Sequence, residues 1–264
     1  MSWWGTIVGG AFGFLLGGPI GALLGVYAGR NFDSGLSQNF GGAEGFGPGA
    51  QQRVQATFFT ATFSVMGYIA KADGRISKDE IQLANRIMDE MRLAPPMKQA
   101  AKALFNKGKQ NGFEFEAVLA QFRQEMHGRK TLTQMFLEIQ IRAASADGEL
   151  RITEKNILNN VATALGFSSY ELESLISRHN SEQGFESSSY TSNSSRLTQA
   201  YGILGLTSSC SDKELKRTYR RLMAQHHPDK LVSKGLPDEM LIIAKEKTQE
   251  IKAAYEMIKK ERKR

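Results

Sequence analysis

Cysteine is nearly absent from this sequence. The single residue, Cys210, has no partner for an intramolecular disulfide, which fits a chain that works in a reducing compartment. Catalytic motifs are missing as well, since no Ser/His/Asp constellation, phosphate-binding loop or paired-carboxylate motif stands out. We therefore expect a protein that is not an enzyme, with no cofactor and no bound metal.

Charge is absent from a long stretch near the amino terminus. Residues 3–29 form 27 positions without a charged side chain, and as a helix they would be about 40 Å long, more than the roughly 30 Å hydrocarbon core of a bilayer. Met1–Trp4 contains no basic residue, which argues against a cleaved signal peptide. The tryptophans and Arg30 suit the two membrane interfaces. The pattern predicts a transmembrane anchor over residues 1–32, with the basic body of the chain on the cytoplasmic side.

Glycine recurs at every fourth position within this span. Such overlapping small-xxx-small steps place one glycine seam along a helix, which suits close approach of two helices in a membrane. Pro19 and the extra glycines leave open that the span is merely flexible. The favoured hypothesis is a homodimer through the seam Gly5, Gly9, Gly13, Gly17, Gly21, Gly25 and Gly29.

Two segments of biased composition divide the remainder. Residues 33–50 contain six glycines without a helical period, and residues 181–196 contain seven serines with little apolar content. Both compositions are typical of linkers. Residues 51–180 between them show apolar residues at helical spacing. We expect one helical domain there, so that the whole chain has an all-α fold.

Two similar sequences recur 74 residues apart in the middle domain, at Tyr68–Ser77 and Arg142–Arg151. In each, an Asp-Gly pair should end one helix and turn the chain into the next. Ser77 and Thr153 are then the expected N-caps of the helices that follow.

These repeats superficially resemble calcium-binding loops, but their spacing is wrong. With Gly74 at loop position six, Ile69 and Lys71 would occupy the first and third ligand positions, and neither side chain has an oxygen to offer. Calcium binding is therefore not expected. The pattern instead resembles the TerB-like helical domain associated with tellurite resistance.

A basic amphipathic helix is predicted near the carboxyl end. Ser211 to Glu214 has the spacing of a capping box, so the helix should begin near Asp212. It should end at Pro228, which lacks an amide hydrogen and disfavours helical geometry in the preceding residue. An apolar face carries Leu215, Tyr219, Leu222 and His226, and the opposite face carries Lys213, Lys216, Arg217, Arg220 and Arg221.

The tripeptide His227-Pro228-Asp229 follows this helix, at the start of a predicted loop that continues over residues 230–237. A second helical period from Leu241 to Ile258 could pack antiparallel to the first helix. Ala200–Leu206 would form a short helix before both. This order resembles the J domain of the DnaJ co-chaperone family over residues 197–264.

The resemblance implies a function in which the chemistry belongs to a partner. His227, Pro228 and Asp229 would engage the ATPase domain of an Hsp70, and the cationic helix would dock onto an acidic surface of that partner. No Gly/Phe-rich region or cysteine-rich module follows the tripeptide. The order of anchor, TerB-like domain and J domain resembles the membrane-anchored DnaJ-like co-chaperones of Gram-negative bacteria. It implies an inner-membrane protein with a periplasmic amino terminus, a DnaK partner with its nucleotide exchange factor, and a part in envelope-stress or capsule-synthesis signalling.

Three other interpretations fit parts of the sequence. His226 and His227 could form a metal pair, but adjacent helical side chains diverge and no further ligands cluster nearby. The cationic face could bind nucleic acid, since residues 197–264 hold 15 Lys and Arg against 9 Asp and Glu, but no aromatic residues are interleaved with those charges. The chain could also be a membrane-tethered scaffold whose TerB-like domain binds an envelope component.

Overall fold

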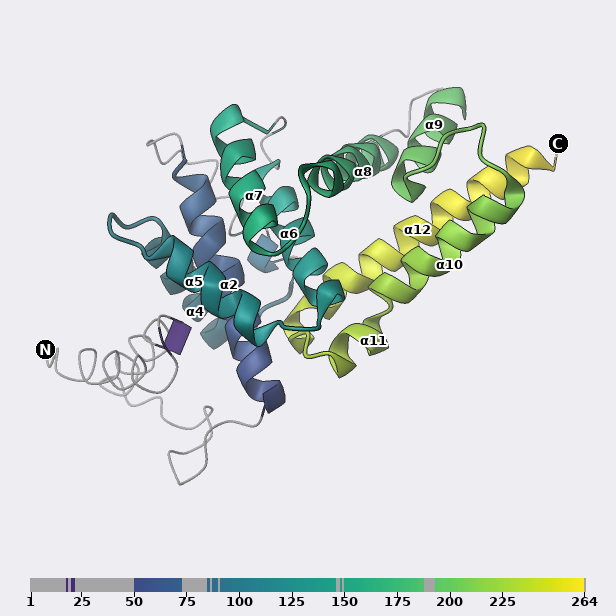
Figure 1. The fold of residues 1–264 in the computed structure, drawn as a ribbon. Coiled ribbons are helices and arrows are strands. Elements are labelled where there is room, and N and C mark those ends of the chain that lie inside the picture. The colour runs from purple at the N-terminus through teal and green to yellow at the C-terminus, as the bar shows by residue number, and fades with distance from the viewer. Residues whose placement is uncertain are drawn as a thin grey trace, which may run out of the picture. The chain divides into compact units, whose positions relative to one another are not determined.

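The computed structural model describes residues 18, 20–21, 50–72, 85, 87–89, 91–145, 148, 150–187 and 193–263. Within these residues the regular structure is helical, as Figure 1 shows, and the predicted all-α class is confirmed. No helix among them is long and apolar enough to cross a bilayer. The predicted anchor, its glycine seam and the first linker lie outside the described residues, apart from residues 18, 20–21 and 50.

The chain divides into two compact units. The first, Met1–Gly128 with Ala143–Ile157, contains α2 (Ala50–Ala70), α4 (Pro95–Gly108) and α5 (Phe115–Glu125). The second, Arg129–Arg142 with Leu158–Arg264, contains the helices that follow. These are α8 (Ser169–Ser187), α9 (Asn193–Leu204), α10 (Asp212–His226), α11 (Pro228–Ser233), the 3-10 turn η1 (Asp238–Met240) and α12 (Leu241–Arg262). Helices α6 (Lys130–Ala144) and α7 (Ile152–Ala164) each have residues in both units.

In the first unit, α2 and α4 approach closely at two glycines. A Cβ added at Gly108 would lie 1.8 Å from the Ser64 carbonyl oxygen, and one at Gly67 would lie 2.0 Å from that of Phe105. The two backbones therefore touch where neither has a side chain. Aromatic contacts then join α2 to the α5 region, with the Phe58 and Phe122 ring centroids 5.9 Å apart. Such packing gives this unit a continuous apolar core.

The second of the two repeats turns the chain as expected, but its cap differs. Gly148 has a φ of 126°, which favours glycine, and it lies between the end of α6 and the start of α7. The prediction that Thr153 caps α7 is wrong, because α7 begins at Ile152. The carboxylate of Glu154 instead accepts the backbone N–H of Arg151 at 2.9 Å. The turn and cap of the first repeat lie outside the described residues.

The serine-rich stretch 181–196, predicted as a linker, is helical at both ends. Helix α8 continues to Ser187 and α9 begins at Asn193. The physical reason is close packing between these helices. A Cβ added at Gly202 would lie 2.2 Å from the Ser181 hydroxyl, and the Phe185 ring packs against the apolar core formed by α9, α10 and α12. Tertiary contacts thus stabilise helix in a segment whose composition disfavours it.

The carboxyl-terminal module is an antiparallel hairpin of α10 and α12, side by side in Figure 1. Tyr219 and Tyr255 stack across it with ring centroids 4.1 Å apart. Helix α9 covers the hairpin through Ala200, Ile203 and other buried residues. This first helix is longer than predicted, beginning at Asn193 rather than Ala200. The predicted loop 230–237 is also partly wrong, since its first residues belong to α11.

Candidate functional site

The start of α10 is held by local and distant contacts. The Ser211 hydroxyl accepts the Glu214 backbone N–H at 3.2 Å, as the capping pattern predicted. From the far end of α12, the Arg262 guanidinium donates to an Asp212 carboxylate oxygen at 2.6 Å and to the Cys210 carbonyl at 2.8 Å. The same side chain donates to the Tyr201 hydroxyl of α9 at 2.9 Å. One arginine therefore joins all three helices of the module.

The cationic face of α10 is exposed along its whole length. All five predicted residues, Lys213, Lys216, Arg217, Arg220 and Arg221, lie on the solvent side, while Leu215, Leu222 and His226 are buried. Partial burial and the nearby guanidinium groups of Arg178 and Arg217 lower the pKa of Arg221. Like charges gathered in this way repel one another. An acidic partner surface would relieve that repulsion and attract the chain at long range.

His227 sits at the junction of two helices. It ends α10 and caps α11, with φ −61° and ψ 124°, the extended geometry that a following proline imposes. Pro228 then occupies the first turn of α11, where its missing N–H is no loss. The His227 Nδ1 atom accepts the Asp229 backbone N–H at 3.3 Å. The tripeptide thus lies on a helix-to-helix turn, not on the loop that was predicted.

Both ionisable side chains of the tripeptide face solvent. The His227 side chain is 47% exposed and that of Asp229 is 91% exposed, and the closest approach of the His227 ring to the Asp229 carboxylate is 3.9 Å. Since Nδ1 accepts a hydrogen bond, the neutral ring carries its proton on Nε2. A donor and an anionic acceptor are therefore presented together at a fixed spacing.

The neighbouring His226 has the opposite environment. Its side chain is 4% exposed and its Nδ1 atom lies 3.6 Å from a Glu138 carboxylate oxygen on α6. Burial lowers the pKa of His226, and the charges of Lys247 and Arg178 add to this against the opposing effect of Glu138. The two adjacent histidines thus diverge, one into the core of the second unit and one into solvent.

A buried ion pair fixes α12 to α8. The Lys247 ammonium contacts a Glu182 carboxylate oxygen, and the side chains are 14% and 6% exposed. Burial alone would raise the pKa of Glu182, but the ammonium of Lys247 and the nearby imidazole of His179, whose Nδ1 atom is 3.8 Å from the carboxylate, lower the pKa to about 2. Burial likewise opposes charge on Lys247, yet the carboxylates of Glu182 and Glu138 raise its pKa. Both groups are therefore ionised in the folded protein at neutral pH.

Helix α6 makes further polar contacts with the hairpin. The Arg142 guanidinium donates to Glu246 of α12 at 3.1 Å, and the Lys234 ammonium donates to the Thr131 hydroxyl at 2.7 Å. Sequence reasoning missed these residues, together with Glu138, Glu182 and Lys247. The sequence shows only that each of them is a charged residue on the inward face of an amphipathic helix. Its role can be assigned only when the helix that packs against that face is known.

The environment of His226 predicts a pH dependence of stability. Its pKa is lowered in the folded state, whereas the unfolded chain has an ordinary histidine pKa of about 6.5. As pH falls below that value the unfolded chain binds a proton that the folded chain does not, so the free energy of unfolding decreases. His226→Gln should flatten this dependence between roughly pH 7 and pH 5, as measured by urea unfolding, while His127→Gln at an exposed site should not. Equal slopes in the wild type and the His226 variant would contradict the assignment.

A capped cationic helix that ends in an exposed His-Pro-Asp turn, closed by an antiparallel second helix, defines a J-domain protein. Comparison with known proteins agrees. A family model described as the DnaJ domain matches residues 199–264, one described as the tellurite resistance protein TerB matches residues 59–176, and one described as the co-chaperone DjlA transmembrane domain matches residues 1–39.

Whole-chain relatives carry the same architecture. The chain is 43% identical to the co-chaperone protein DjlA of Photobacterium profundum over 273 residues, covering 98% of this chain and 99% of the relative. It is 44% identical over 282 residues to that of Vibrio cholerae, and 40% identical over 269 residues to that of Coxiella burnetii, with 99% of each chain covered in both cases. No solved structure matches the chain.

The chain belongs to the DjlA family of membrane-anchored co-chaperones. The predicted amino-terminal membrane anchor, TerB-like middle and carboxyl-terminal J domain are thereby confirmed. Membership of a co-chaperone family also confirms that the chain acts as a regulator and not as an enzyme.

Proposed function

We propose that this co-chaperone stimulates the ATPase of a cytoplasmic Hsp70, DnaK, at the bacterial inner membrane. The observation that carries the proposal is the pair of exposed side chains, His227 and Asp229, on a rigid turn beside an exposed cationic helix. The long-range charge of α10 orients the encounter, and the turn supplies contacts that differ between two states of the partner. The proposed binding residues are His227, Pro228, Asp229, Lys213, Lys216, Arg217, Arg220 and Arg221.

The proposal is tested by single-turnover ATP hydrolysis. DnaK loaded with ATP should hydrolyse it several-fold faster when the full-length chain in nanodiscs is added, and the stimulation should weaken as salt rises, because exposed charges are screened over about 10 Å at 0.1 M salt. The nucleotide exchange factor should then be needed for repeated turnover. Unchanged hydrolysis at low salt would favour the scaffold interpretation, in which the TerB-like domain binds an envelope component.

The topology follows from the charge distribution. Residues 1–29 contain no charged side chain, and the chain beyond residue 29 carries the whole net charge of +7. Positive charge is retained on the cytoplasmic side of a span, and ATP and DnaK are found there. The amino terminus is then periplasmic, and the membrane location supports a role in envelope-stress or capsule-synthesis signalling.

Homodimerisation through the anchor completes the proposal. The glycine at every fourth position of residues 5–29 supports close approach of two helices. Replacing Gly13 and Gly17 by leucine should abolish self-association in a membrane two-hybrid assay, because leucine side chains would separate the helices. Replacing Ala11 and Ala22 by leucine is the matched control, because these positions lie about 160–180° around the helix from Gly13. Undiminished association of the seam variant would refute the dimer.

A further inference from the structure

The first unit carries a second cationic surface, separate from α10. Between Glu90 and Glu114 the chain contains five cations and no acidic residue. Arg92, Lys102 and Lys107 are exposed, and Lys98 and Lys109 are half-buried. Another stretch without acidic residues, between Glu44 and Asp73, contains only two cations, so the concentration of positive charge in residues 91–113 is distinctive. A partner of opposite charge would account for it.

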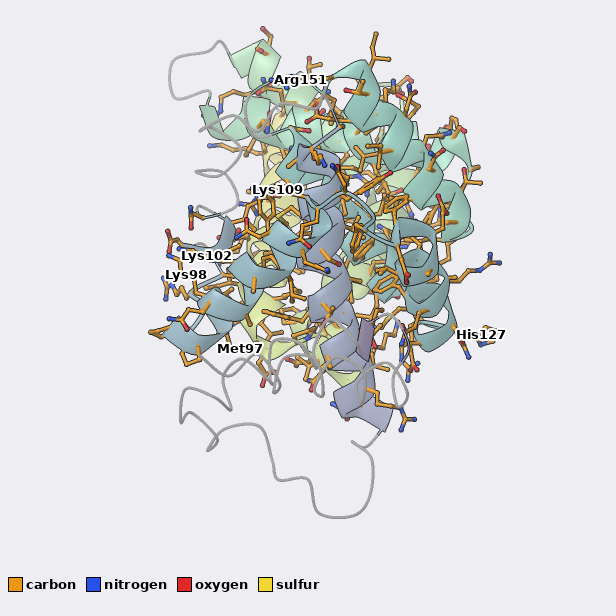
Figure 2. The ribbon with its side chains drawn as sticks, turned by 90° about the vertical axis from the view of Figure 1, so that its left-hand side faces the viewer. Met97, Lys98, Lys102, Lys109, His127 and Arg151 are labelled. Atoms are coloured by element: carbon orange, nitrogen blue, oxygen red, sulfur yellow. The ribbon has the colours of Figure 1, made fainter. Side chains whose placement is uncertain are left out.

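Three of these lysines form a row along α4 and its C-cap residue, Lys109. At 100° per residue, positions 98, 102 and 109 fall within about 40° of one another, whereas position 107 points to the other side of the helix. Figure 2 shows Lys98, Lys102 and Lys109 spaced along α4. The adjoining face, with Ala101, Leu104 and other residues, is buried against α2, so the row runs along the edge of the buried surface. Lys98 also contacts Asp89, whose side chain is 63% exposed, so this carboxylate offsets one of the three positive charges of the row.

An apolar tip precedes the lysine row. Ala94, Pro95 and Pro96 are exposed and Met97 is half-buried, and these four residues lie between Arg92 and Lys98. Prolines at the first turn hold the tip rigid. Exposed apolar residues flanked by cations suit the boundary between lipid headgroups and acyl chains. Nucleic acid fits less well, since the exposed residues of this segment include no aromatic ring for stacking.

The membrane anchor keeps this surface close to a bilayer. The DjlA transmembrane match ends at residue 39 and α2 begins at Ala50. A connection of about ten residues reaches at most about 35 Å whatever its conformation. In Figure 2 the start of α2 and the Met97 end of α4 lie toward the same side of the view. The tether therefore attaches at the end of the unit that carries the apolar tip.

We propose that α4 docks on anionic lipid headgroups of the membrane that holds the anchor, with the lysine row (Lys98, Lys102 and Lys109) on the phosphates and residues 94–97 at the acyl-chain boundary. Confinement by the anchor raises the local concentration of lipid, so weak individual contacts suffice. The helical domain then rests on the bilayer instead of moving freely around its tether. This inference is independent of whether the J domain stimulates DnaK.

The test places a fluorophore at the tip of the full-length chain. Ala94→Cys, in a Cys210→Ser background, is labelled with the environment-sensitive dye NBD, and the protein is placed in nanodiscs of phosphatidylcholine with or without phosphatidylglycerol. We expect the emission to shift to the blue and to be quenched by spin-labelled acyl chains only in the anionic nanodiscs. The combined variant Lys98→Glu, Lys102→Glu and Lys109→Glu should lose both signals. Lys107→Glu, on the other side of the same helix, should keep them.

Salt provides a measurement that does not depend on the folding of a variant. Raising the ionic strength should reverse the blue shift in the labelled parent, because exposed charges are screened. A dye that stays in water in both lipids, or a shift that survives both high salt and reversal of the lysine row, overturns the proposal. The first of these outcomes would assign the cationic surface to an acidic protein.

Discussion

His227→Gln is expected to abolish the stimulation of DnaK while leaving the fold intact. The imidazole is about half exposed, and it contacts the backbone N–H and the carboxylate of Asp229, two residues away. Glutamine can accept the same backbone hydrogen but cannot present an imidazole to a partner. Exposed substitutions of this kind change stability by about 0.5 kcal/mol or less. Single-turnover ATP hydrolysis by DnaK measures the loss, and urea unfolding checks the fold.

A matched histidine provides the control for this experiment. His127 is exposed (Figure 2) and lies in the first unit, away from the J domain in sequence. His127→Gln should therefore keep full stimulation. If the His227 variant stimulates DnaK as strongly as the His127 variant does, the role assigned to the tripeptide is wrong.

Lys247→Met is expected to destabilise the protein strongly. The substitution removes the cation beside Glu182 and leaves a carboxylate buried without its partner. Breaking a buried pair from one side typically costs about 3–5 kcal/mol. The free energy of unfolding from urea titration gives the loss. Lys252→Met, on the exposed side of α12, should change it by about 0.5 kcal/mol or less.

The double variant shows whether the charge is the cause. Glu182→Gln together with Lys247→Met removes both charges, so it should recover part of the stability that the single lysine variant loses, with a coupling free energy well above about 0.5 kcal/mol. Additive effects would mean that the loss comes from apolar packing of the lysine stem. The same ion pair joins α8 to α12, so the single variant should also weaken the packing of α12 against α8.

Much of the J-domain site can be predicted from the sequence, because the residues that fix its helix ends and its exposed face act locally. The Ser211 cap, the stop at Pro228 and the separation of apolar from cationic residues each act within one or two turns of helix. From those signals both ends of α10 were predicted correctly, and the tripeptide was placed outside the helix, where the side chains of His227 and Asp229 are exposed. The short helix α11 escaped prediction because six residues are too few for a helical period to be recognised.

The sequence alone also identified the amino-terminal anchor, because a long uncharged run needs no tertiary information to be recognised. The resemblance to the J-domain and TerB families likewise rests on the order of motifs along the chain. Only the tertiary structure decided that both ends of the serine-rich stretch are helical, and that Glu138, Glu182 and Lys247 are buried. These outcomes depend on which surfaces meet. A charged side chain has the same sequence signature whether it faces water or a partner helix, and the free energy that separates the two cases comes from contacts distant along the chain.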